Sequence, residues 1–360
     1  MLKQTVLYQK HKELGARFTE FGGWDMPVQY SSIIEEHNAV RNDVGIFDTS
    51  HMGTFIISGN NAKKFLDYVT VSDISSLPLY KAKYSMLLND NGGIKDDIIV
   101  YKFENCYMMV VNAGNLDKDF NWLNEHKMKD VEIKNISKEI CMMAVQGPKA
   151  PQLVASLVED EILSMKYFTA KDVKFKGQAK EASFSKIART GYTGEDGFEI
   201  FISNKYAEYI WSKIIELGAK PCGLGCRDTL RLEACMPLWG HEISEETNPI
   251  DTGFIKTVFL NKDFIGKQAI EKNKNTPSKK LVAFICQNGI ARSHDEVYMN
   301  NEKIGYVTSG SFSPTFKKAI GMALIDVSIN ETLSIQVKVH NNLRNITIVP
   351  KPFYKRAKTK

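Results

Sequence analysis

The sequence predicts an α+β protein that ends in a small β-barrel. In the first part of the chain, helical patterns alternate with strand patterns joined by short turns, which favours antiparallel sheets over a doubly wound parallel sheet. After the polar stretch at residues 271–278, short strand patterns follow one another, with polar turns at Asn300-Asn301 and Asn341-Asn342. Such a series favours a small barrel. The polar stretch therefore marks the clearest predicted domain boundary.

A helix is predicted to begin after Ser32. Ser32 and Glu35 have the spacing of a capping box, in which the serine side chain accepts a hydrogen bond from the backbone N–H three residues later. Ile33, His37 and Val40 then share one face of the helix. Because this face is otherwise apolar, we expect His37 in the core and not as a ligand.

A strand, a short helix and three antiparallel strands are predicted next. Residues 54–58 have a strand pattern and residues 62–69 a helical one. The turn-forming sequence at residues 90–93 lies inside residues 84–103, which predicts a hairpin, and residues 107–111 supply a third strand.

The second half of this region predicts the same kinds of element. Residues 142–145 form a strand pattern, and Pro148 is expected in the first turn of a helix that continues through Leu157, since proline is favoured there. Residues 198–202 form an apolar strand.

Composition excludes several classes of protein. The 360 residues are 43% hydrophobic and 25% charged, which is enough to bury the cores of two or three domains. The start lacks the apolar run of a signal peptide, and no stretch approaches the roughly 18 apolar residues of a membrane span. We therefore expect a cytoplasmic protein with no membrane contact. The net charge of +5 comes without a basic stripe interleaved with aromatic residues, which argues against nucleic-acid binding.

The six cysteines predict buried, reduced thiols. Cys222, Cys226 and Cys235 lie close in sequence, but they contain no Cys-x-x-Cys pair, and His241 follows only after a Pro-Leu-Trp-Gly break. These spacings do not match those of structural zinc sites. We therefore predict no metal.

A glycine-punctuated loop carries much of the functional information. Residues 189–199 read Arg-Thr-Gly-Tyr-Thr-Gly-Glu-Asp-Gly-Phe-Glu, and they bring Tyr192 and Glu199 to the start of an apolar strand. Glycine permits backbone angles that a side chain would forbid. A charged residue in such a setting can serve a structural ion pair or a binding site.

A second glycine-rich segment follows at residues 223–234. Its two glycines open a predicted helix on which Arg227 and Arg231 lie four residues apart, on one face. The segment lacks the third glycine of a dinucleotide fingerprint, so a Rossmann fold is disfavoured. Arg231 and Glu233 are expected to be structural.

Together, these two segments resemble those of the aminomethyltransferase (T protein) of the glycine cleavage system. Weaker similarities occur in the same order along nearly the whole chain, which makes coincidence improbable. They are Phe21-Gly22-Gly23-Trp24-Asp25-Met26-Pro27, Phe47-Asp48-Thr49-Ser50-His51-Met52-Gly53, Gly92-Gly93-Ile94-Lys95-Asp96-Asp97, Gln146-Gly147-Pro148-Lys149, Thr247-Asn248-Pro249 and Lys351-Pro352-Phe353-Tyr354.

The resemblance implies a three-domain cloverleaf around a central channel. We expect a folate-binding region over residues 1–270, built from two intertwined α+β subdomains of which the second spans about residues 54–135. A C-terminal β-barrel domain is expected over residues 279–360.

Asp96 and Asp97 lie within an otherwise apolar strand. Adjacent strand residues face opposite sides, so at least one of the two carboxylates should face an enclosed side, where it needs a partner or a function. A charge at a wet hairpin end is the alternative. The resemblance selects Asp97 as the catalytic residue.

The resemblance also implies a pocket for a reduced pterin. A carboxylate can accept hydrogen bonds from the amide and amino edges of a pterin, and an arginine fork suits the glutamate carboxylates of folate. The implied binding residues are Met52, Tyr84, Asp97, Val111, Asn112, Tyr192, Glu199 and Arg227.

The implied reaction is aminomethyl transfer. The one-carbon unit carried on the lipoyl group of a partner, the carrier (H) protein, passes to tetrahydrofolate, and ammonia is released. A folate-dependent demethylase and a folate-binding protein without transferase activity are the alternatives. The sequence leaves open whether His51 is a general base or orders its loop, and what Met236 and Trp239, which depart from the family pattern, do to the pocket.

Overall fold

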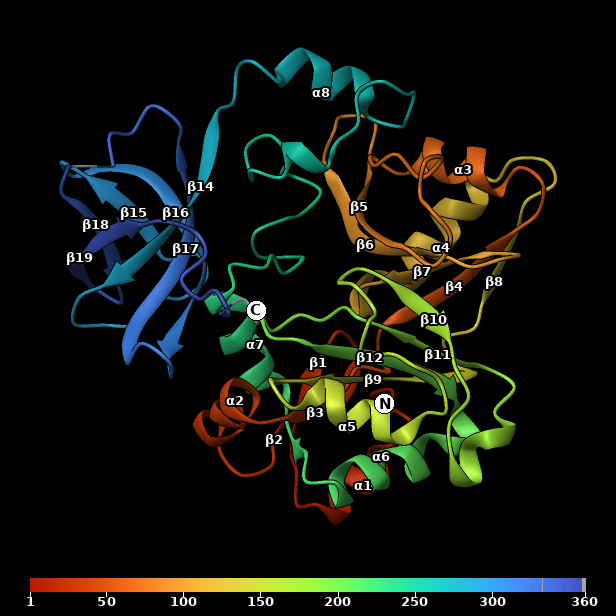
Figure 1. The fold of residues 1–360 in the computed structure, drawn as a ribbon. Helices are drawn as coiled ribbons and strands as arrows, with labels where there is room; N and C mark the ends of the chain where they lie inside the picture. Colours follow the sequence, from red (N-terminus) through yellow and green to blue (C-terminus); the bar gives the residue numbers. More distant parts are fainter. Residues whose placement is uncertain (332, 358–360) are drawn as a thin grey trace. The chain divides into compact units, whose positions relative to one another are not determined.

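The computed structural model describes residues 1–331 and 333–357 (Figure 1). The chain packs into two compact units. The first unit contains residues 1–67, 73–85 and 98–227, and the second contains residues 68–72, 86–97 and the described chain from Asp228 onward. Within the described ranges, each helix is too short or too polar to traverse a lipid bilayer.

The N-terminal elements comprise two short helices and a two-stranded ribbon. They are α1 (Tyr8–Glu13), β1 (Arg17–Phe21), β2 (Trp24–Gln29) and α2 (Ile33–Asn42). Ser32 caps α2, because its Oγ accepts a hydrogen bond of 3.2 Å from the backbone N–H of Glu35. The predicted cap is confirmed, and His37 is fully buried, as expected of a core histidine.

A first group of elements, which we call the first repeat, covers residues 53–135. It consists of β4 (Gly53–Ser58), α3 (Ala62–Val69), β5 (Ala82–Leu88), β6 (Ile94–Lys102), β7 (Tyr107–Val111), the 3-10 turn η1 (Ala113–Asn115), α4 (Leu116–Glu125) and β8 (Glu132–Asn135). Its sheet has the order β5-β6-β7-β4-β8. The predicted strand at 54–58, helix at 62–69 and three-stranded meander are confirmed.

A second group, the second repeat, covers residues 140–221. It consists of β9 (Ile140–Gln146), α5 (Ala150–Leu157), β10 (Ala170–Asp172), η2 (Gly177–Glu181), β11 (Ser185–Ala188), β12 (Gly197–Ser203), η3 (Asn204–Tyr206), α6 (Ala207–Glu216) and β13 (Lys220–Pro221). With β3 (Gly45–Asp48), its strands form a sheet of order β10-β11-β12-β9-β3-β13.

The two repeats have the same order of elements. In each, a strand and an eight-residue helix (α3, α5) precede a three-stranded meander, which is followed by a three-residue 3-10 turn and a ten-residue helix (α4, α6). In each sheet, the last strand of the meander pairs with the strand that opens the repeat. A large core cluster lies mainly in the second repeat, where Val154, Ile210 and Trp211 on α5 and α6 pack with strand residues such as Ile200.

The chain then forms helices and a closed barrel. The elements are α7 (Leu224–Glu233), η4 (Ile255–Thr257), α8 (Lys267–Asn273), β14 (Lys279–Cys286), β15 (Glu296–Met299), β16 (Glu302–Ser313), β17 (Lys318–Asp326), β18 (Ile335–Val339) and β19 (Asn342–Val349). The six strands close in the order β14-β17-β16-β15-β18-β19, so none is left with an open edge. The predicted α+β class and the C-terminal barrel are confirmed.

Two local predictions were wrong. Pro148 precedes the N-cap Lys149 of α5, and Pro151 is the proline in the first helical turn. The turn predicted at Asn341-Asn342 instead consists of His340 and Asn341, because Asn342 already belongs to β19. His340 has a φ of 53°, an angle that histidine, like asparagine, adopts more often than most residues, so the turn begins one residue before the predicted asparagine pair.

Candidate functional site

The loop before β12 is held at both ends by side chains. Arg189 makes a two-point ion pair with Asp196, with N···O distances of 3.0 and 2.7 Å. In the middle of the loop, Thr193 donates to Oε1 of the buried Gln146 at 2.9 Å, and Arg41 donates to the Thr193 carbonyl at 2.8 Å. The loop that carries Tyr192 is therefore fixed before any ligand binds.

Glu199 lies on β12 with its side chain buried. Its Oε2 accepts a hydrogen bond of 3.2 Å from the Tyr101 hydroxyl and a second one from the Thr190 hydroxyl. Burial raises the pKa of Glu199, while Thr190, the charge of Arg227 and Tyr101 act in the opposite direction. Glu199 is therefore a buried acid whose protonation depends on the balance between burial and these three neighbours.

Arg227 on α7 completes this cluster. Its guanidinium carbon lies 4.7 Å from the centroid of the Tyr192 ring, in the geometry of a cation–π contact. Burial lowers the pKa of Arg227, although Tyr192 and Glu199 favour its charge. Its Nη1 is buried and makes no hydrogen bond to any residue in the described part of the chain. A buried donor of this kind is costly unless a ligand supplies an acceptor.

Gly223 places the start of α7 against the N-terminal elements. A Cβ at this position would lie 2.3 Å from the backbone carbon of Val28, so any other residue would push the helix away. The backbone N–H of Gly223 donates to Glu36 Oε2 at 2.8 Å, which anchors the segment. The position of Arg227, one helical turn later, follows from this close approach.

His51 lies beside Arg227 and is 1% exposed. Burial and the charge of Arg227 lower the pKa of His51 to about 4. Its Nδ1 has no hydrogen-bond partner among the residues that the structure describes, and the ring makes an edge contact with Phe21 at 5.6 Å. His51 is therefore a neutral imidazole near pH 7.

Met52, Val111 and Asn112 meet at the paired ends of β4 and β7. Gly53, next to Met52, is the register partner of Val111, and Asn112 follows at the start of η1. Met52 also packs against the core cluster that contains Tyr101. Met52 directly follows His51, whose pKa responds to the charge of Arg227.

Asp96 and Asp97 differ in burial along β6. Asp96 is fully buried on the same side as Ile94 and Ile98, whereas Asp97 is half-buried on the opposite side. The prediction that one of the two faces an enclosed side is confirmed, and that residue is Asp96. Tyr84, on the neighbouring strand β5, is also half-buried.

The start of β6 belongs to the second unit and is tied to residues 239–247 of the same unit. The indole Nε1 of Trp239 donates to the Ile94 carbonyl at 3.3 Å, and the Ile94 N–H donates to the carbonyls of Ser244 and Thr247. Lys95 forms an ion pair of 3.8 Å with Glu245. Trp239 therefore supports the strand that carries the two aspartates.

Arg231 and Glu233 are structural, as predicted. Arg231 donates to Glu242 at 2.8 Å and to Ser309 at 2.7 Å. Glu233 accepts hydrogen bonds from Ser313 and Thr315 at 2.5 and 2.8 Å. Both side chains are buried and bind residues of β16 or the turn after it, so they connect α7 to the barrel.

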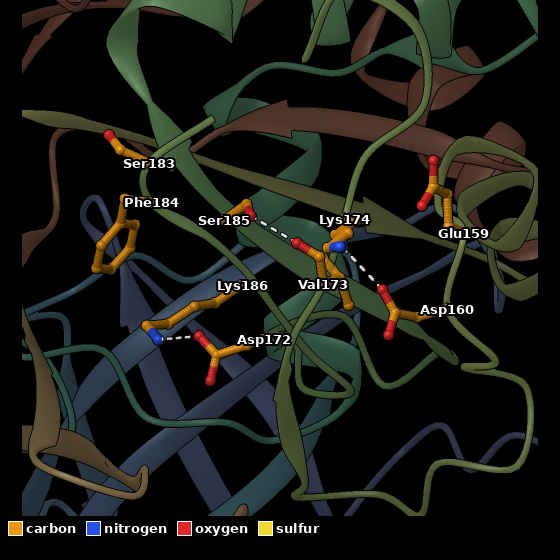
Figure 2. A pocket seen from close by; sticks show the side chains of 9 residues that line it. All are labelled: Glu159, Asp160, Asp172, Val173, Lys174, Ser183, Phe184, Ser185 and Lys186. Carbon is orange, nitrogen blue, oxygen red and sulfur yellow. Dashed lines mark hydrogen bonds and ion pairs between the residues drawn. The ribbon is translucent and has the colours of Figure 1, made fainter. Parts of the chain in front are cut away.

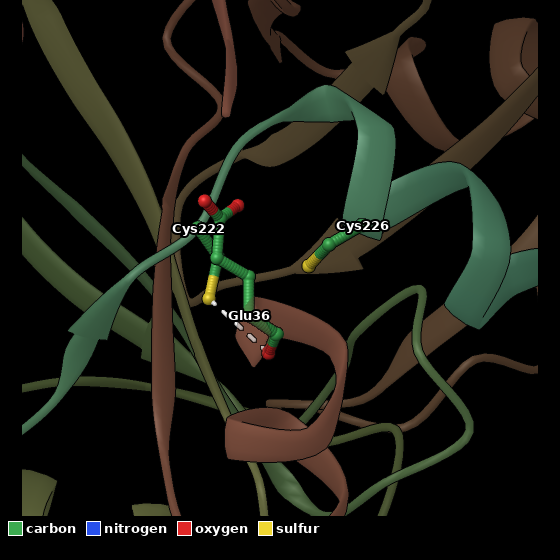
Figure 3. Close-up of side chains that lie close together, drawn as sticks. All are labelled: Glu36, Cys222 and Cys226. Atoms are coloured by element: carbon green, nitrogen blue, oxygen red, sulfur yellow. Dashed lines mark hydrogen bonds between the residues drawn. The ribbon is translucent and has the colours of Figure 1, made fainter. Parts of the chain in front are cut away.

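Cys222, Cys226 and Glu36 lie close together (Figure 3). Their potential ligand atoms lie within 4.8 Å of one another. However, the Glu36 carboxylate already accepts hydrogen bonds from the backbone of Tyr30, Ser31 and Gly223 at 2.6, 3.0 and 2.8 Å. Burial also raises the pKa of Cys226 well above its usual value. Two thiols and one carboxylate that is already hydrogen-bonded do not match the four ligands of a structural zinc site.

A hollow of about 450 Å³ beside β10 and β11 contains none of the predicted site residues (Figure 2). Two of its carboxylates already have partners: Asp172 pairs with Lys186, and Asp160 accepts a hydrogen bond of 2.8 Å from the backbone N–H of Lys174. We therefore do not assign a site to it.

Sequence reasoning missed Tyr101 and Thr190 as partners of Glu199. Tyr101 lies in an apolar strand, where it looks like a core residue, and Thr190 lies within the quoted loop motif. The hydroxyl of Tyr101 in an apolar strand was the available signal, but nothing in the sequence indicates that β6 and β12 approach each other.

The protein is an α+β protein with a terminal barrel, and it contains a buried cluster of an acid, an arginine and a tyrosine. Residues 7–262 match the family described as GCVT N-terminal domain, and residues 279–355 match the glycine cleavage T-protein C-terminal barrel domain. The chain belongs to this T-protein family.

Similar proteins match over nearly their whole length. Curated aminomethyltransferases from Bacillus mycoides (42% identical, covering 99% of both chains) and Thermotoga maritima (44% identical, covering 98% of both chains) are among them. The crystal structure of glycine cleavage system aminomethyltransferase T from Bartonella henselae superposes with a TM-score of 0.92, at 30% identity and 99% coverage of both chains.

Proposed function

We propose that the protein is a tetrahydrofolate-dependent aminomethyltransferase of the glycine cleavage system. The observation that carries this proposal is full-length similarity to aminomethyltransferases, together with the buried cluster of Tyr192, Glu199 and Arg227. The one-carbon unit leaves the lipoyl arm of a carrier protein and is taken up by tetrahydrofolate. The products are methylenetetrahydrofolate, ammonia and the reduced lipoyl arm.

Residues of the first unit would recognise the pterin. Glu199 would accept hydrogen bonds from its amide and amino groups, and Arg227 would use its unpaired Nη1 as a donor to the folate. Tyr192 stacks on Arg227 and would hold it in this orientation. The full proposed binding set is Met52, Tyr84, Asp97, Val111, Asn112, Tyr192, Glu199 and Arg227.

Asp97 is the proposed catalytic residue. Strand alternation gives it the same side of β6 as Tyr101, whose hydroxyl donates to Glu199. Its carboxylate would orient the folate N5 and stabilise the positive charge that develops as the amine departs. Holding the nitrogen next to the methylene carbon would supply much of the rate.

His51 is not a general base at neutral pH in this proposal. A base with a pKa of about 4 is almost entirely unprotonated at pH 7 but accepts a proton weakly. The neutral ring instead adds no charge beside Arg227, which leaves the guanidinium free to bind an acceptor on the ligand.

The proposal is tested by measuring ammonia and methylenetetrahydrofolate with an aminomethylated, lipoylated carrier protein and tetrahydrofolate. Both products should form at equal rates. Demethylation of small amines without carrier-dependent ammonia release would instead identify a folate-dependent demethylase. Folate binding with neither activity would identify a binding protein.

Folate should also bind in the absence of a partner, because seven of the eight proposed binding residues belong to the first unit. Calorimetry with the purified chain measures this directly. No heat of binding at millimolar tetrahydrofolate would contradict the proposed pocket.

The cytoplasmic location stays a prediction from the sequence.

A further inference from the structure

Two segments, one from each repeat, meet on the surface of the first unit. Lys81 and Thr169 form an antiparallel bridge. On either side, the N–H of Ala82 donates to the Phe168 carbonyl at 3.0 Å, and the N–H of Ala170 donates to the Tyr80 carbonyl at 2.9 Å. We call the surface formed by residues 78–83 and 163–172 the junction surface.

The junction surface exposes three large apolar side chains. Leu79, Leu163 and Tyr167 are 46%, 46% and 44% exposed. They lie next to a hollow of about 350 Å³ whose lining includes Tyr80 and Met165. Large exposed apolar side chains gathered in one place are typical of interaction sites.

The charge of the surface is mainly positive, because its one acidic residue, Asp172, pairs with Lys186. Lys81 and Lys166 line the hollow and Lys83 is exposed close by, and none of these three forms an ion pair with a residue in the described ranges. Lys171, by contrast, pairs with Asp160 at 3.1 Å. The lysines without an acidic partner leave a positive rim around an apolar floor.

The surface is preformed. Tyr80 and Phe168 both have positive φ angles, 60° and 58°, which aromatic residues adopt only where the surrounding structure holds them. The Arg189 guanidinium donates to the carbonyls of Leu163 and Met165 at 2.9 and 2.5 Å. A partner would therefore meet a surface that needs little ordering.

The surface shares a core cluster with the candidate site. Tyr80 and Phe168 pack against the core cluster that contains Tyr101, and the Tyr101 hydroxyl donates to Glu199. Arg189, which supports residues 163–165, opens the loop that carries Tyr192. Docking here would place a partner against the same core that supports the cluster.

We propose that the junction surface docks the lipoyl-bearing carrier protein through an acidic face that inserts an apolar side chain into the hollow. This inference rests on the proposed function. Charge complementarity favours an acidic partner over a second copy of this chain, because two chains of net charge +5 repel each other.

The first test reverses charge on the rim. Lys81→Glu combined with Lys166→Glu should raise KM for the aminomethylated carrier about tenfold at low salt and leave kcat unchanged, with a smaller effect at 1 M salt, where screening is strong. The control is Lys127→Glu combined with Lys129→Glu, which makes the same charge change at two other exposed lysines of the first unit. The control variant should behave like the unmodified protein.

The second test removes the apolar contact. Leu79→Ser combined with Leu163→Ser should raise KM for the carrier at both low and high salt, because apolar contacts are not screened. Both residues are largely exposed, so the fold should persist, and thermal unfolding checks this.

Free aminomethyl-dihydrolipoamide separates the inference from the proposed function. All variants should use it as the unmodified protein does, since it needs no docking surface. If the variants keep an unchanged KM for the carrier, the junction surface is not the docking site, although the function stands. If the unmodified protein turns over neither substrate, the proposed function is wrong. A change in oligomeric state measured by ultracentrifugation would identify a second copy as the occupant and overturn the inference.

Discussion

The two repeats share a framework and differ at several of the places where proposed site residues lie. Both place an eight-residue helix after the first strand, and both place a positive-φ aromatic residue before the meander. In the first repeat, the β5–β6 hairpin is long and carries Asp96 and Asp97, whereas the second repeat has the short strands β10 and β11 with η2 between them.

The second repeat departs from the framework in the other connection of its meander, between the second and third strands. Its connection from β11 to β12 is the long loop with Tyr192, whereas β6 and β7 are joined by a tight turn in which the Phe103 N–H donates to the Cys106 carbonyl at 2.9 Å. β12 buries Glu199, and β7 is apolar throughout. The comparison teaches that the two departures from the framework carry Asp97 and Tyr192, two of the proposed site residues.

The largest effect is expected from Asp97→Asn on the long hairpin. The change keeps the shape and deletes the charge, so turnover should fall by about 10²–10³, which is typical when one electrostatic group of an active site is lost. Steady-state ammonia release measures this.

Asp96→Asn is the matched control for Asp97→Asn. Asp96 is fully buried, so the change should lower stability by about 1–3 kcal/mol in urea unfolding while the folded fraction keeps its turnover. Equal losses of turnover from both variants, with unaltered stability, would mean that the wrong carboxylate has been assigned.

His51 has no buried counterpart in the second repeat. Gly59 and Gly147 directly follow the equivalent strands β4 and β9. Glu139 precedes Gly147 by the same number of residues as His51 precedes Gly59, and Glu139 is exposed. The pKa of His51 is lowered to about 4 in the folded state from about 6.5 in the unfolded state. The unfolded state therefore binds more protons between these values, and stability should be lost as pH falls from 6.5 to 4, by about 3 kcal/mol.

His51→Gln should remove this part of the pH dependence. Urea unfolding at several pH values between 4 and 7 measures the difference between the two proteins, and NMR titration of the His51 ring reports its pKa directly. A ring that titrates near 6.5 would contradict the neutral, buried imidazole and reopen the role of general base.

Glycine substitutions at equivalent positions of the two repeats should lower stability by similar amounts. Gly59 and Gly147 have φ angles of 104° and 130°, and a Cβ at each would lie 2.2 or 2.4 Å from a backbone carbonyl oxygen. Gly59→Ala and Gly147→Ala should each lower the free energy of unfolding by roughly 2–3 kcal/mol through clash and strain. If one variant loses less than about 1 kcal/mol, the two positions are not equivalent.

Glu199→Gln should have the smallest effect. Losing one charge-assisted contact should weaken tetrahydrofolate binding by about 1.5–3 kcal/mol in calorimetry. Because burial raises the pKa of Glu199, its ionised form costs stability as pH rises above the ordinary value near 4.5. The unmodified protein should therefore lose stability relative to the variant as pH rises. Glu139→Gln, at an exposed acid, should change neither property.

The sequence by itself determined the local elements. The Ser32 cap, the hairpin around residues 90–93 and the apolar strand at 198–202 depend on neighbours in the chain, and short-range rules describe them well. Resemblance to a family, and not local pattern, selected Asp97, Glu199 and Arg227.

Only the tertiary structure decided what these residues touch. Tyr101 reaches Glu199 because β6 and β12 lie in different sheets that share a core, and Arg227 stacks on Tyr192 because Gly223 lets α7 approach Val28. The low pKa of His51 likewise requires burial beside a guanidinium that is remote in sequence. Such contacts join segments that are far apart along the chain, and their energies depend on desolvation, which no local pattern of residues encodes.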